Sequence, residues 1–151
     1  MRPDETIVFV PAFEAWVGIG EEPPLREARI AWYGAKSGRY ELKFRDRKGV
    51  WRTKHRWVFT EVYASHEHYA ASQKANKERE RVAFFERAAA AAMVRWCEGN
   101  DNRAFAKAAV AAHKLIRARA RLAKLEAKCN QMGAALPHIA RRLEIEKGRA
   151  A

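Results

Sequence analysis

The stretch YELKFRDRKGVWRTKHRWVF (Tyr40–Phe59) decides the fold of the first part of the chain. Apolar residues alternate with charged residues on both sides of a short polar segment, Asp46–Gly49. A period of two places successive side chains on opposite faces of a β-strand. The stretch therefore predicts a hairpin of two antiparallel strands, Tyr40–Arg45 and Val50–Thr60, which turns at the polar segment.

The alternation also predicts that this hairpin has an aromatic face and a basic face. Trp51 and Trp57 are in phase with each other, so both are expected on the aromatic face, which enters the core. Between Lys36 and Val58 nine basic residues accompany two acidic ones, a net charge of +7. Like charges on neighbouring strands destabilise a sheet unless solvent or a bound anion compensates them. We therefore expect a polyanion to contact the basic residues of the hairpin, which are Lys43, Arg45, Arg47, Lys48, Arg52, Lys54 and Arg56.

Shorter strands are predicted before the hairpin. Pro23 and Pro24 interrupt the pattern and predict a loop. Five short strands in a module of residues 1–64 are typical of a small SH3-like β-barrel, and a bent antiparallel sheet packed against helices is the alternative. The three earlier strands are expected at Thr6–Val10, Ala15–Ile19 and Arg29–Tyr33.

The pattern changes at Ser65, a suitable N-cap, and the rest of the chain is alanine-rich and helical. The overall fold class is therefore α+β, with a helical part over residues 65–147. Two long helices are expected at about 66–98 and 103–132, separated by the helix-breaking segment Gly99–Asn102. A short third helix is expected at about 136–146, followed by a frayed tail at 148–151.

The second long helix carries an apolar seam with alternating spacings of three and four residues. The seam consists of Ala104, Ala108, Ala111, Leu115, Ala118, Leu122, Leu125, Cys129 and Met132. Such a seam, facing the first helix across a short turn, predicts an antiparallel hairpin that packs like a coiled coil. A second apolar stripe on the same helix is left over for the sheet module, the third helix or a second copy of the chain. It consists of Phe105, Ala109, Ala112 and Ile116.

Basic residues form a third stripe on the second helix. Over Arg103–Lys128 eight basic residues accompany only Glu126, again a net charge of +7. A solvated helix usually intersperses glutamates that support it through i,i+4 pairs, so their scarcity favours contact with phosphates. Arg119 points away from the stripe and is expected to pair with an acidic residue across the hairpin. The stripe consists of Lys107, Lys114, Arg117, Arg121, Lys124 and Lys128.

No catalytic or cofactor signature is present in the sequence. His66 and His68 have a spacing that suits a helical metal site poorly, and no Cys or His nearby completes a ligand set. There is no glycine-rich phosphate loop and no nucleophile elbow. We therefore expect neither a metal nor a cofactor, and a protein that is not an enzyme.

The charge balance points to an acidic partner. The 30 basic and 18 acidic residues give a net charge of +12, which attracts nucleic acid first and acidic proteins second. Our leading hypothesis is therefore a DNA- or RNA-binding protein. The alternative is a protein-interaction or assembly module: a viral or mobile-element protein that binds a host complex, or a ribonucleoprotein subunit. The apolar runs are too short for a membrane span, and a cytoplasmic location is expected.

Overall fold

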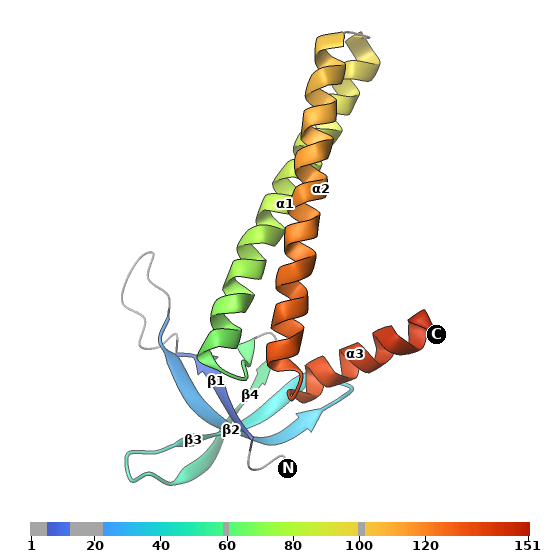
Figure 1. Cartoon of the computed structure of the whole chain (residues 1–151). Helices are drawn as coiled ribbons and strands as arrows, with labels where there is room; N and C mark the ends of the chain where they lie inside the picture. Colours follow the sequence, from blue (N-terminus) through green and yellow to red (C-terminus); the bar gives the residue numbers. More distant parts are fainter. Residues whose placement is uncertain (1–5, 13–22, 59–60, 100–101) are drawn as a thin grey trace. The chain divides into compact units, whose positions relative to one another are not determined.

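The computed structural model describes residues 6–12, 23–58, 61–99 and 102–151 (Figure 1). Four β-strands precede three α-helices, as expected for an α+β chain. By their contacts the residues divide into a sheet unit, Met1–Tyr69 with Asn130–Ala151, and a hairpin unit, Ala70–Cys129. The third helix therefore groups with the sheet, whereas the sequence had assigned it to the helical part.

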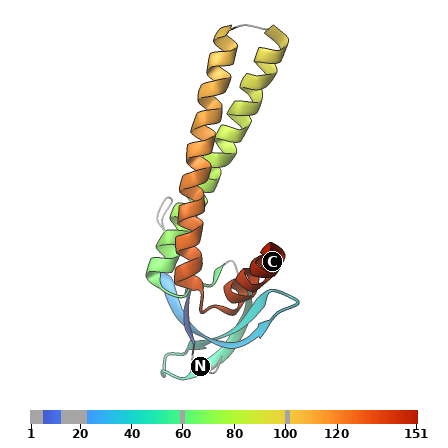
Figure 2. The same ribbon diagram turned by 45° about the vertical axis from the view of Figure 1, so that its right-hand side comes forward.

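The strands form one antiparallel sheet in the order β1-β2-β3-β4 (Figures 1 and 2). Their bounds are β1 Ile7–Pro11, β2 Leu25–Gly34, β3 Arg39–Arg45 and β4 Trp51–Val58. Two register shifts mark irregularities of the kind that bend a strand: Ala31 is the extra residue on β2, and Lys54 is the extra residue on β4. The predicted hairpin is thus present, and β2 begins at Leu25, four residues before the start of the predicted strand Arg29–Tyr33. The predicted strand Ala15–Ile19 lies outside the described residues.

The sheet is not closed into the predicted SH3-like barrel. Among the described residues β4 does not pair with β1, so the strand order remains open. After β4 the described chain returns to β1 at Tyr63, which exchanges two backbone hydrogen bonds with Phe9 at 2.8 and 2.9 Å. One bridge is too short to make a fifth strand that would close the sheet.

The core of the sheet unit combines one face of the sheet with the last helix. The alternating residues Tyr40, Leu42 and Phe44 of β3 are buried, which confirms the period-two prediction for this strand. Leu136 and Ile139 enter the same core from the start of α3 (Pro137–Ala150). The remaining members are Val8, Val10, Ala28, Ile30 and Val62.

Helix α3 is longer than predicted and is anchored to the sheet unit (Figure 2). It continues to Ala150, through most of the segment expected to fray. Arg141 donates a hydrogen bond to the backbone carbonyl of Ala35 at 2.7 Å, and Arg142 contacts the side chain of Asn130. These polar contacts add to the burial of Ile139 in the core of the sheet unit.

The long helices are α1 (His66–Gly99) and α2 (Asn102–Gly133), which lie side by side and antiparallel in both ribbon views. Ser65 caps α1 as predicted, since its Oγ accepts a hydrogen bond from the His68 amide at 3.0 Å. Ala108 and Ala118 of the predicted α2 seam are buried, and the small side chains let the helices approach closely. Ala75 and Glu78 are buried on α1.

Candidate polyanion-binding site

The register shift between β3 and β4 determines which face of the sheet carries Trp51. At the Tyr40 end of β3, before the shift, Tyr40 pairs with Trp57, as the alternation predicts. Beyond the shift Lys43 pairs with Thr53, and Arg45 pairs with Trp51. Residues directly opposite each other in an antiparallel pair share a face. Trp51 therefore lies on the basic outer face, and its predicted place among the core aromatics is wrong.

Two guanidinium groups lie over the Trp51 ring. The Cζ atom of Arg29 on β2 is 4.5 Å from the ring centroid, and that of Arg45 on β3 is 4.8 Å from it. Lys43 completes the group because its register partner on β2 is Arg29. We call these four residues, Arg29, Lys43, Arg45 and Trp51, the arginine–tryptophan cluster.

Within the part of the chain that the structure describes, ion pairs do not neutralise the positive charge of this cluster. Among the described residues no carboxylate lies within ion-pair distance of Arg29, Lys43 or Arg45. The Nε atom of Arg29 is buried and has no hydrogen-bond partner there. A cation–π contact holds a guanidinium in place while leaving most of its N–H donors available. The cluster is therefore arranged to accept an anion.

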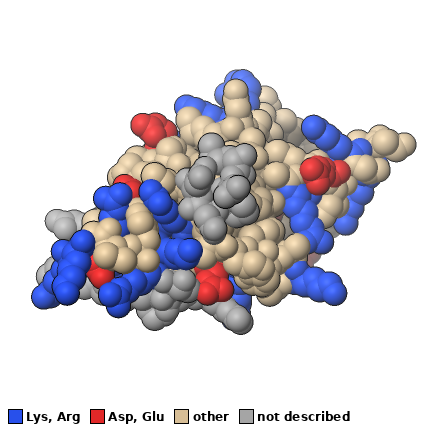
Figure 3. Space-filling view, turned by 90° about the horizontal axis from the view of Figure 1, so that it is seen from below, with Lys and Arg blue, Asp and Glu red and all other residues tan. Residues whose placement is uncertain are grey.

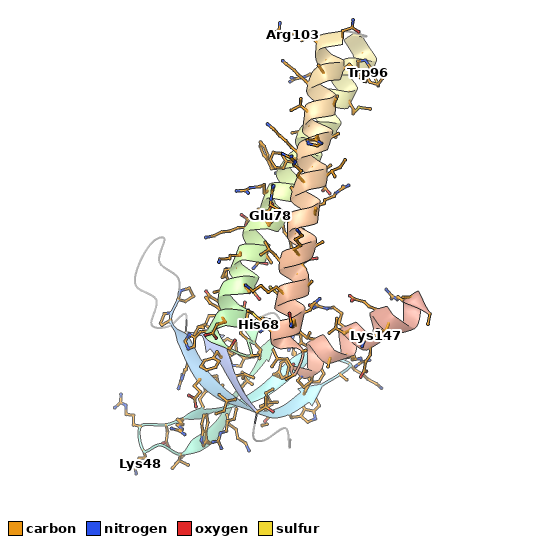
Figure 4. The ribbon with its side chains drawn as sticks, in the orientation of Figure 1. Lys48, His68, Glu78, Trp96, Arg103 and Lys147 are labelled. Carbon is orange, nitrogen blue, oxygen red and sulfur yellow. The ribbon has the colours of Figure 1, made fainter. Side chains whose placement is uncertain are left out.

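The β3–β4 turn extends the positive surface (Figures 3 and 4). Asp46 holds the turn, because its Oδ1 accepts hydrogen bonds from the amides of Lys48 at 2.9 Å and Val50 at 3.0 Å. The hydrogen bond from Val50 contributes most to holding the pKa of Asp46 below its usual value. The hydrogen bond from Lys48 and the charge of Arg52 lower this pKa further. Arg47 and Lys48 are exposed at the tip, where Figure 3 shows Lys and Arg side chains crowded with only scattered acidic ones.

The other predicted contacts of the sheet are less available or not described. Arg52 pairs with Asp46 at 3.1 Å, so part of its charge serves the turn. Lys54 and Arg56 lie on β4, and Arg56 is in register with Glu41, but their side chains are outside the described residues. Arg29 was missed by the sequence reasoning because β2 is distant from the hairpin in sequence. Its alternation with Ala28 and Ile30 was the available signal.

The basic stripe of α2 is exposed along its whole length: Lys107, Lys114, Arg117, Arg121, Lys124 and Lys128. Arg121 is partly engaged, because its Nε lies 3.0 Å from the buried carboxylate of Glu78. Arg119 pairs with Glu86 at 2.9 Å across the two helices, as predicted. The stripe belongs to the hairpin unit and the arginine–tryptophan cluster to the sheet unit, so each is a separate candidate surface.

The second apolar stripe of α2 is exposed. Phe105 is 53% and Ile116 is 64% exposed, and Ala109 and Ala112 are also exposed. Phe105 touches Trp96 of α1, with ring centroids 5.2 Å apart, but remains open on its other side. The described residues thus leave this stripe uncovered.

Other chemistry is not built by the described residues. They contain no group of three potential metal ligands, and His68 is buried with its Nδ1 accepting a hydrogen bond from the Ala64 amide at 3.0 Å. Cys97 and Cys129 are free thiols. The described helices include none that combines the length and apolar character needed to cross a bilayer.

Comparison with known proteins adds no assignment. The chain matches no protein-family model, no curated protein and no solved structure. The functional argument therefore rests on the two charged surfaces and the exposed apolar faces.

Proposed function

We propose that this chain is a non-enzymatic nucleic-acid-binding protein whose primary contact is the arginine–tryptophan cluster. The observation that carries the proposal is the placement of two guanidiniums over one indole ring on a sheet face where no described carboxylate pairs with them. Guanidinium groups bind phosphate oxygens in a bidentate fork, so fixed arginines favour a phosphate backbone over a single point charge.

The ligand that suits this cluster best is a single strand. Bases stack on aromatic rings and on guanidinium planes, and the cluster provides both kinds of surface. Arg47 and Lys48 at the adjoining turn would contact further phosphates. Four residues of the basic stripe of α2, namely Arg117, Arg121, Lys124 and Lys128, are proposed as a second surface that contacts the backbone without reading sequence. Free thiols at Cys97 and Cys129 suit the reducing cytoplasm, where we propose that the protein acts.

A salt series tests the proposal. Fluorescence anisotropy would compare labelled single- and double-stranded DNA and RNA of one sequence. Five phosphate contacts, from Arg29, Lys43, Arg45, Arg47 and Lys48, predict a slope of about −3.5 in log affinity against log salt for a single strand. That slope corresponds to a loss of about 100-fold between about 50 and 200 mM salt. Affinity that does not change with salt would contradict the proposal.

Charge-matched variants separate the surfaces. The double variant Lys43→Glu/Arg45→Glu should lower affinity more than about tenfold and reduce the slope by about 1.4. Lys147→Glu/Arg149→Glu at the exposed end of α3 makes the same change in net charge and serves as the control. Lys124→Glu/Lys128→Glu reports on the α2 stripe. Equal losses for the first pair and the control pair would show that only net charge matters.

A second candidate function, assembly through the hairpin, is favoured by the exposed stripe of Phe105 and Ile116. Contiguous exposed apolar faces of this kind mark protein–protein contacts. Analytical ultracentrifugation should then show self-association that Phe105→Ser/Ile116→Ser abolishes. A monomer at all concentrations would leave nucleic-acid binding as the function supported by the surfaces.

A further inference from the structure

A groove with an apolar floor and a basic rim runs between α1 and α2 in the hairpin unit. Its volume is about 490 Å³. Phe84, Phe85 and Ala88 of α1 and Ala106, Val110 and Ala111 of α2 line it, together with three basic residues, Arg103, Lys107 and Lys114. This groove is distinct from the Phe105–Ile116 stripe and was not anticipated from the sequence.

The floor of the groove exposes large apolar side chains to solvent. Phe84 is 59% and Val110 is 55% exposed, so each presents a large apolar side chain to water. Burying apolar surface stabilises a complex by about 25 cal/mol per Å². Because these side chains lie at an open groove and not inside a closed cavity, the shape suits an extended occupant such as a helix more than a small molecule.

The rim determines the chemistry of the occupant. Among the described residues that line the groove, none is acidic. Lys107 and Lys114 are seven residues apart on α2, about 10.5 Å along the helix, which matches the spacing of charges two turns apart on a helix that packs against it. An occupant with carboxylates beside its apolar face would therefore satisfy the floor and the rim together.

We infer that this groove binds an amphipathic helix of a partner protein whose apolar side is flanked by Asp or Glu. Helices bind such grooves through apolar anchors at positions i, i+3 or i+4, and i+7. A second copy of this chain in the same groove is disfavoured, since a two-fold contact would oppose the lysines of both copies. Nucleic acid is disfavoured because it would cover the apolar floor with phosphates.

Three synthetic helical peptides of about 18 residues test the inference with the full-length protein. They share Leu anchors at the i, i+4 and i+7 positions and differ only in the flanking residues, which are Glu, Gln or Lys. We expect the Glu peptide to bind at least about tenfold more tightly than the Gln peptide and the Lys peptide to bind weakest. Equal affinities, or no binding of the Glu peptide up to about 1 mM, would overturn the inference.

Variants of the rim and the floor make the test specific to the groove. Lys107→Glu/Lys114→Glu should reverse the order, so that the Lys peptide binds best, and circular dichroism would confirm that the helices remain. Val110→Glu should abolish binding of the Glu peptide, whereas Ile116→Ser on the opposite stripe should leave it unchanged. If the Glu peptide still bound after the rim and floor changes, the inference would be overturned. It would also be overturned if an oligonucleotide displaced the Glu peptide and itself bound the Lys107→Glu/Lys114→Glu variant more weakly. Failure of Lys43→Glu/Arg45→Glu to weaken nucleic-acid binding would affect only the proposed function.

Discussion

The hydroxyl of Tyr40 joins the sheet to α3 through two atoms of a single residue, His138. The hydroxyl oxygen lies 2.6 Å from His138 Nδ1 and accepts a hydrogen bond from the His138 amide at 3.1 Å. Both contacts are satisfied when the hydroxyl donates to a neutral imidazole that carries its proton on Nε2. Tyr40 is fully buried, and burial raises its pKa above the usual value, so it remains a donor.

Replacement of Tyr40 by phenylalanine should weaken the attachment of α3. The change keeps the ring but removes the hydroxyl that the His138 amide and Nδ1 both contact, at a cost of about 1–2 kcal/mol. Thermal denaturation followed by circular dichroism would measure the loss. Tyr33→Phe, a change on the half-buried neighbouring ring, serves as the control, and equal effects of the two changes would contradict the role assigned to the hydroxyl.

Stability should decrease on mild acidification. Burial, followed by the nearby charges of Arg142 and His68, lowers the pKa of His138 to about 4, and burial lowers that of His68. In the unfolded chain both imidazoles take up protons near about pH 6.5, whereas in the folded protein they take them up only at lower pH. Between these pH values protonation therefore favours the unfolded state. The stabilisation is therefore complete above about pH 6.5 and is lost as the pH falls toward 4.

Urea titrations at several pH values would measure this dependence. The His138→Asn variant should show a weaker decline between about pH 6.5 and 4 than the unmodified protein. An unchanged decline would show that His138 does not titrate with folding.

The buried carboxylate of Glu78 should stabilise the hairpin unit. It lies 3.0 Å from Arg121 and 3.4 Å from Arg81, whose side chains are about half exposed. Glu78→Ala leaves Arg81 and Arg121 without this carboxylate at the interface between the two helices. The change should lower the free energy of unfolding by about 1–2 kcal/mol. Glu86→Ala removes a comparable but exposed pair with Arg119 and should cost less than about 1 kcal/mol. A double-mutant cycle with Arg121→Ala would measure the coupling.

Gly133 should not tolerate a side chain. A Cβ atom there would collide with the Cδ1 of Ile139 and lie 2.6 Å from the Cε1 of His68. Gly133→Ala should therefore destabilise the sheet unit by about 1–3 kcal/mol. Gly148→Ala is the matched control, since a Cβ added there would have no atom within 4 Å and alanine favours a helix. Equal melting temperatures for the two variants would contradict this prediction.

Trp51 should matter more for single strands than for duplexes. Trp51→Ala removes a stacking surface and the ring that holds Arg29 and Arg45, and should lower single-strand affinity by about 10- to 100-fold. Duplex affinity should change less because phosphate contacts dominate it. Trp32→Ala removes an exposed indole elsewhere on β2 and should have little effect. Equal losses for both ligands would argue against stacking.

Much of the fold follows from local patterns in the sequence. The alternation of β3, the cap at Ser65 and the seam of α2 are each encoded within one continuous segment, and each was predicted. The position of Trp51 was not, because it depends on how β3 and β4 pair. One extra residue on β4, Lys54, shifts their register and reverses the face of the β4 residues that precede it. The burial of Glu78 was also missed, since its partner Arg121 is supplied by the other helix.

The candidate sites divide in the same way. The basic residues of the sheet turn and of α2 are visible as charge runs, whereas Arg29 joins them only through pairing of β2 with β3. The groove was invisible for a related reason: its floor requires Phe84 and Val110, which belong to different helices. The periodicity of a sequence describes one helix or strand at a time, whereas each of these features is formed by residues from two elements.

The sheet unit is built from both ends of the chain, with the hairpin unit inserted between them, and this sets an order for folding. During synthesis the strands emerge first, but their core lacks Leu136 and Ile139 until the whole insertion has been made. The insertion consists of local helical contacts, which form quickly, whereas docking of α3 brings together residues distant in sequence. Rapid pairing of α1 and α2 brings the two segments of the sheet unit close together. The last helix then has fewer conformations to sample before it packs on the sheet.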